Sequence, residues 1–100
     1  MKENIPKSFK LFGLTIKVEF DDKYCNNHNI YGEINHSEGI IRLCTEHKGD
    51  KLSEDVILDT FYHEKVHCIL EAMCERELNN NEKFVDVFAK LLRQSDITAK

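Results

Sequence analysis

The chain has 100 residues and a net charge of −4, and 41% of its residues are hydrophobic. This length suits a single domain over residues 1–100, and the composition is typical of an ordered globular chain because it includes only four Gly and one Pro. The 14 Lys and Arg residues are scattered, which argues against nucleic acid as a partner, since proteins that bind it carry a basic patch or stripe.

The N-terminal residues 1–10 are charged and lack the apolar core of about 7–15 residues that a signal peptide needs. No run approaches the roughly 20 apolar residues that cross a bilayer. We therefore expect a cytoplasmic protein with no membrane partner and with flexible ends at residues 1–7 and 95–100. The four cysteines have no C-x-x-C spacing, which excludes a zinc ribbon or a thioredoxin-like motif and predicts buried free thiols.

Two hairpins are predicted in the N-terminal half. Residues 9–12 and 14–20 alternate apolar and polar side chains around Gly13, and Asp21-Asp22 ends the second strand. Residues 30–34 and 40–44 flank a turn-rich five-residue segment. The strand at residues 40–44 is either an edge on which an extended peptide adds as a further strand or an ordinary core strand. Residues 48–51 are predicted to form a loop.

A metal-binding pattern follows in the apolar-periodic segment that begins at Ser53. His63-Glu64-Lys65-Val66-His67 is an H-E-x-x-H motif. Residues four apart lie on one face of a helix, so His63 and His67 are placed to bind one ion. Glu64 is turned about 100° from His63, and its carboxylate is placed to hydrogen-bond a water on that ion as a general base.

A solvated helix face that carries His and Glu by chance is the alternative to this interpretation. The neighbours of the motif argue against it, because their apolar side chains predict a largely buried helix in which two histidines and a glutamate need polar partners. A metal ion satisfies all three. Cys68 directly follows His67 and points in a different direction, which favours a place in the core over ligation.

The third ligand must come from elsewhere, since catalytic zinc usually takes three protein ligands. No histidine follows His67, which excludes the metzincin pattern, and Glu71 would lie about 12 Å along the helix axis from His63. Residues 81–92 form a second helical pattern with Glu82 near its start and Asp86 one turn later. We expect Glu82 to be the third ligand and Asp86 to support a ligating histidine. Alternatively, Glu82 only interacts with the helix dipole and Asp86 faces solvent.

These residues resemble a known family. H-E-x-x-H followed by N-E-x-x-x-D is similar to the thermolysin-type zincins, in which the glutamate is the third zinc ligand and the aspartate supports the site. Residues 82–92 resemble more closely the E-x-x-A-N-x-F-A-x-x-L pattern of ImmA/IrrE metallopeptidases from phages and mobile elements, from which Val85 and Asp86 depart conservatively. The resemblance covers residues 30–93 and implies action on repressors or regulators.

The sequence favours a zinc-dependent peptidase with a protein or peptide substrate. In this hypothesis His63, His67 and Glu82 hold the ion, and Glu64 takes a proton from water and passes it to the leaving amine. So short a chain leaves little room for a deep cleft, which predicts narrow specificity. The oxyanion-stabilising residue is not identified among four candidates: Tyr31, His36, His47 and Tyr62. The rival hypotheses are a non-catalytic zinc domain and a metal-free protein-interaction domain.

The predicted fold class is α+β, with a small antiparallel or mixed sheet followed by a metal-binding helix and a C-terminal helix. His67 and Glu82 meet only if the first helix ends between Met73 and Arg76, because a longer helix would carry the chain away from the motif. The link through Glu77 must then fold back and place the second helix beside the first.

Overall fold

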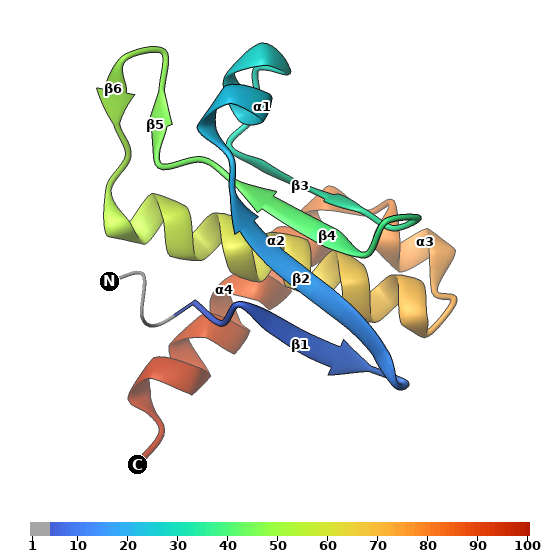
Figure 1. Ribbon diagram of the computed structural model, residues 1–100. Coiled ribbons are helices and arrows are strands. Elements are labelled where there is room, and N and C mark those ends of the chain that lie inside the picture. The colour runs from blue at the N-terminus through green and yellow to red at the C-terminus, as the bar shows by residue number, and fades with distance from the viewer. Residues whose placement is uncertain (1–4) are drawn as a thin grey trace.

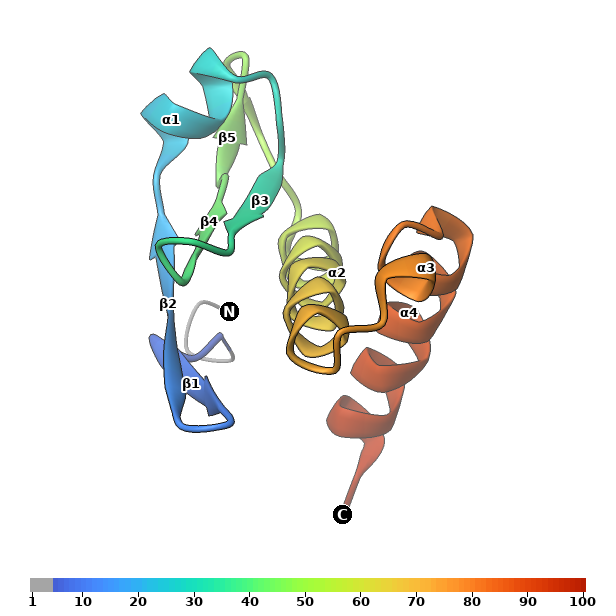
Figure 2. The same cartoon turned by 90° about the vertical axis from the view of Figure 1, so that its right-hand side faces the viewer.

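The computed structural model, which describes residues 5–100, has an α+β fold arranged in layers: a four-stranded sheet, then α2 (Glu54–Ala72), then α4 (Glu82–Thr98) (Figures 1 and 2). Helix α2 lies between the sheet and α4 and contacts both. The predicted fold class is therefore confirmed. The buried apolar residues form one core cluster, centred on Ile41, Leu43, Phe61, Val66 and Val85.

Both predicted hairpins are present, and they combine into a mixed sheet. Strands β1 (Ser8–Leu11) and β2 (Leu14–Phe20) pair antiparallel, as do β3 (Gly32–Asn35) and β4 (Ile40–Leu43). Strands β2 and β4 pair in parallel, which gives the order β1-β2-β4-β3. Parallel neighbours need a long connection, and here the chain between β2 and β4, which includes α1 and β3, supplies it.

Of the two interpretations of residues 40–44, the structure shows the core strand and not the sheet edge. Strand β4 is paired on both sides, and within residues 5–100 the edges of the sheet are β1 and β3. The backbone N–H of Cys44 donates to the Tyr31 carbonyl at 2.9 Å. In an antiparallel pair, every second residue of a strand is hydrogen-bonded to the neighbouring strand, and counting from Tyr31 the residue bonded to β4 is Glu33. Gly32 and Ile34 therefore direct their backbone polar groups away from β4, on the side of the sheet edge.

Two short elements were not predicted. Helix α1 (Asp22–Asn27) starts where the strand was expected only to end, and the Asp21 side chain caps it by accepting from the Tyr24 N–H at 3.0 Å. The predicted loop at residues 48–51 is instead part of a small hairpin, β5 (Glu46–His47) with β6 (Asp50–Lys51). Lys48 and Gly49 both have positive φ, of 53° and 88°, which matches the tight turn that a two-residue hairpin needs.

Helix α2 starts and ends as predicted. The Ser53 side chain caps it by accepting from the Val56 N–H at 3.2 Å, and Met73 is its C-cap. One face packs under the sheet, where Gly32 lies so close that a Cβ there would be 2.6 Å from the Thr60 methyl group. The helix is thus held firmly against strand β3.

The link after α2 folds back, as predicted, through the one-turn helix α3 (Arg76–Asn79). Asn81 then caps α4 by accepting from the Phe84 N–H at 3.0 Å, and α4 returns along α2. Helix α4 continues to Thr98, through part of the segment predicted to be flexible. At the other end, residues 1–4 lie outside the described part of the chain, while Ile5 is only 6% exposed and belongs to the core. No described helix is long and apolar enough to cross a membrane.

Candidate metal centre

The H-E-x-x-H motif lies in the middle of α2, about two and a half helical turns from its start. His63 and His67 are one turn apart, with ring centroids 4.9 Å from each other and ring planes at 69°. Their side chains are 24% and 15% exposed, so both imidazoles are shielded but reachable. The helix thereby aims two nitrogen donors at one point, as the four-residue spacing requires.

Glu82 reaches the same point from the start of α4. Its Oε2 lies 3.2 Å from His63 Nε2, and its Oε1 lies 3.5 Å from His67 Nε2. One ligand atom from each of these three residues lies within 4.8 Å of the other two, a spacing that could hold a metal ion. Two imidazoles and a carboxylate form a donor set that suits zinc and several other divalent transition metals.

Glu64 is half-buried next to these residues but is not part of the ligand group. Burial raises the pKa of its carboxyl group to about 7, because desolvation disfavours the charged form, and the negative charge of Glu82 acts in the same direction. The electrostatic influence of His67 and a backbone hydrogen bond from Ile34 lower the pKa in part. The hydrogen bond from Ile34 is consistent with its place on the edge strand β3, where its backbone polar groups point away from β4.

Asp86 lies beside His63, as the sequence predicted, but at a longer distance than a hydrogen bond. Its Oδ1 is 3.8 Å from His63 Nδ1. Both of its carboxylate oxygens accept from Lys90 Nζ at 2.9 Å, and this contact is the main reason that the pKa of Asp86 is lowered. Asp86 is therefore shared between His63 and Lys90, with the stronger contact to Lys90.

Asn79 is a site residue that the sequence did not reveal. Its Oδ1 lies 2.5 Å from His67 Nδ1, on the opposite side of the ring from Glu82. Three consecutive asparagines, Asn79 to Asn81, are typical of a turn and a helix cap, and Asn81 does cap α4. Which of three adjacent asparagines faces the motif depends on the turn geometry of α3, for which the sequence has no signal.

A cleft of about 520 Å³ opens next to the ligands. His63, Glu64 and Asp86 line one part of it, and Tyr31 and His47 line another. Of the four candidates for oxyanion stabilisation, these last two therefore face the cleft. His36 lines a different hollow, and the Tyr62 hydroxyl donates to Asp96 at 2.8 Å within the α2–α4 contact.

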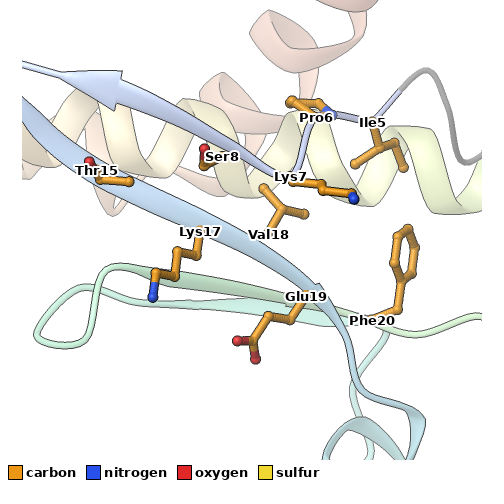
Figure 3. Close-up of a pocket in the computed structure, with 9 residues that line it drawn as sticks. All are labelled: Ile5, Pro6, Lys7, Ser8, Thr15, Lys17, Val18, Glu19 and Phe20. Atoms are coloured by element: carbon orange, nitrogen blue, oxygen red, sulfur yellow. The ribbon is translucent and has the colours of Figure 1, made fainter.

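Two further features lie apart from the metal centre. Cys68 is buried in the core, where desolvation raises the pKa of its thiol to about 12, as expected for a packed residue. A larger cavity, of about 820 Å³, lies between residues 5–8 and strand β2 (Figure 3). Lysine, glutamate, hydroxyl and apolar side chains line it, with no histidine or cysteine among the described lining residues.

Comparison with known proteins found no match to this chain: no family model, no curated protein sequence and no solved structure matches it significantly.

Proposed function

We propose that this protein is a zinc-dependent metallopeptidase of narrow specificity, with the ImmA/IrrE-type peptidases as the motif-based model for its chemistry. The convergence of His63, His67 and Glu82 from two helices, next to a carboxylate that is not a ligand, supports the proposal. Three protein donors leave a position for water or substrate, as in catalytic rather than structural zinc sites.

Each residue has a chemical role in this proposal. His63, His67 and Glu82 would hold the ion, which when bound supplies Lewis-acid chemistry that acidifies water and polarises a carbonyl oxygen. Glu64 acts as the general base and then passes the proton to the leaving amine. Without a metal ion the pKa of Glu64 is raised to about 7, and a bound cation would favour the ionised form, which is the form that accepts a proton from water.

The substrate is a peptide segment or an unfolded part of a protein. The cleft beside Glu64 is open, and the edge strand β3 next to it has backbone groups that point away from β4. An extended peptide could pair with this edge and so bring a peptide bond to the ligand group. Such a peptide would compete with the existing contact between Ile34 and Glu64.

Digestion of a complex peptide mixture by zinc-loaded protein tests the proposal. Mass spectrometry should detect new termini with the wild type and none with Glu64→Gln, which removes the base and keeps the ligands. Lys65→Gln, next in sequence and outside the ligand group, is the matched control and should cleave like the wild type. Cleavage that persists in Glu64→Gln would contradict the assigned base, and no cleavage by zinc-loaded wild type would contradict the peptidase proposal.

A non-catalytic interaction domain is the second candidate, and one surface favours it. Phe88 and Leu91 on α4 are 46% and 61% exposed and, with Phe84 and Val87, line an apolar hollow on this helix. Exposed apolar patches commonly mark protein contacts. If this surface carries the function, Leu91→Lys should abolish capture of a partner protein, while Glu64→Gln should leave the capture unchanged.

A further inference from the structure

The contacts of His67 continue beyond Asn79 to the surface of the molecule. Asn79 lies on α3 between the imidazole of His67 and the carboxylate of Glu71, which is on α2 one turn after His67. Its Oδ1 is 2.5 Å from His67 Nδ1, and its Nδ2 is 3.4 Å from Glu71 Oε2. Glu71 is exposed, and it is the outer end of this chain of contacts.

The carboxylate of Glu71 determines which way the Asn79 amide faces. An ionised carboxylate only accepts hydrogen bonds, so the amide NH₂ group must turn toward it. The amide oxygen is then left facing His67. A side-chain amide oxygen is also only an acceptor, so the His67 nitrogen opposite it must carry the proton.

The tautomer of His67 follows from this order of donors and acceptors. In a neutral imidazole one nitrogen is a donor and the other an acceptor. With the proton on Nδ1, the lone pair is on Nε2, the atom that lies 3.5 Å from Glu82 Oε1. In the opposite tautomer, the lone pairs of His67 Nδ1 and Asn79 Oδ1 would repel each other across the 2.5 Å contact. The proton would then be on Nε2, where a metal ligand needs a lone pair.

We propose that Glu71 and Asn79 are positioning residues that hold His67 as the Nδ1–H tautomer, so that Nε2 is the nitrogen that binds the metal. This inference rests on the proposed metal site and adds to it a link through α3. Helix α3 then does more than connect two helices, because its last residue orients a ligand of the site. Asn79 is half-buried and Glu71 exposed, so Asn79 has the larger effect of the two.

The tautomer is measurable in the metal-free protein, separately from any activity. Long-range ¹H–¹⁵N NMR on the neutral imidazoles should show a protonated Nδ1 and an unprotonated Nε2 for His67 in the wild type. Asn79→Leu, of similar size but without an acceptor, should give a mixture of tautomers, and Asn79→Asp should keep the wild-type form. Glu71→Ala should shift the population partly. A wild-type His67 protonated on Nε2, or no change in Asn79→Leu, would overturn the proposal.

Zinc binding gives the second measurement. Asn79→Leu should weaken zinc binding by about 10- to 100-fold, the usual effect of losing an outer partner of a ligating histidine. Asn79→Asp should restore most of the affinity, and Asn80→Leu, an exposed neighbour, is the matched control and should bind like the wild type. Unchanged zinc affinity in a folded Asn79→Leu protein would count against the positioning role. If the tautomer is as proposed but the wild type binds no zinc, the proposed function fails and the tautomer assignment stands.

Discussion

At the scale of single residues, Glu64 has the most unusual environment of the site. It is half-buried near Glu82, and desolvation raises the pKa of its carboxyl group to about 7 from an ordinary value of 4.5. In the metal-free protein this group is therefore a source of instability near neutral pH. A cation bound by His63, His67 and Glu82 would favour the ionised form, because opposite charges attract.

The pH dependence of stability should report this shift. Between pH 4.5 and 7 the unfolded chain releases the Glu64 proton while the folded chain retains it, so the free energy of unfolding falls as the pH rises through this window. Glu64→Gln has no such group. We expect the free energy of unfolding of Glu64→Gln, relative to wild type, to increase by about 3 kcal/mol at most between about pH 4 and pH 8. Urea unfolding of both chelator-treated proteins measures it.

A pH-independent difference between the two proteins would contradict the raised pKa. Glu77→Gln is the matched control because Glu77 is exposed on α3, and this variant should follow the wild type at every pH.

At the scale of secondary-structure elements, the site depends on the return of α4 along α2. Arg93 on α4 donates to Asp59 at 2.8 Å and to Asp55 at 2.7 Å, so the late part of α4 is tied to the early part of α2. The other end of α4 thereby lies beside the motif, which brings Glu82 to the histidines. On the opposite side of α2, strand β3 packs against the helix through Gly32 and Thr60.

Gly32→Ala should disturb this β3–α2 contact. The new methyl group would lie 2.6 Å from Thr60 Cγ2 and 3.0 Å from the Arg42 carbonyl oxygen, so neighbouring atoms must move. Overpacking of this kind typically costs about 1–3 kcal/mol. Thermal unfolding should show the loss, and Thr60→Ser, which removes the opposing methyl group, should recover part of it in the double variant. A Gly32→Ala protein as stable as the wild type would contradict the close packing.

Much of the element order could be predicted from the sequence because the signals were local. Alternating strand residues, the Ser53 and Asn81 caps and the helical period of α2 each depend on neighbours in the chain. The parallel pairing of β2 with β4 could not be predicted, since it depends on contacts between distant segments. The two-residue strands β5 and β6 are too short for a pattern.

The same distinction between local and long-range features applies to the candidate site. The spacing of His63, Glu64 and His67 is local and was readable from the sequence. The approach of Glu82 was predicted from the need for a third ligand. The contact of Asn79 with His67 depends on how α3 packs, and the partial burial of Glu64 depends on how strand β3 packs. Neither could be predicted from the sequence.

At the scale of the whole molecule, a 100-residue chain has a small core, and a metal ion that joins α2 to α4 would stabilise it. A ligand that binds only the folded state adds about 2.7 kcal/mol when it is present at 100 times its Kd. For a domain of this size we expect such zinc addition to raise the Tm by roughly 10–20 °C. Differential scanning calorimetry with zinc or with chelator measures the shift, and His63→Ala should lose most of it.

The most direct test of the proposed metal centre is a zinc titration of the untagged protein, followed by isothermal calorimetry, in wild type and Glu82→Ala. Glu77→Ala, an exposed carboxylate nearby in the sequence, is the control. We predict about one zinc ion per wild-type chain and an affinity at least tenfold lower in Glu82→Ala, because the site would lose its α4 ligand. A wild-type protein that binds no zinc, or a Glu82→Ala protein that binds it as tightly, would contradict the three-residue site.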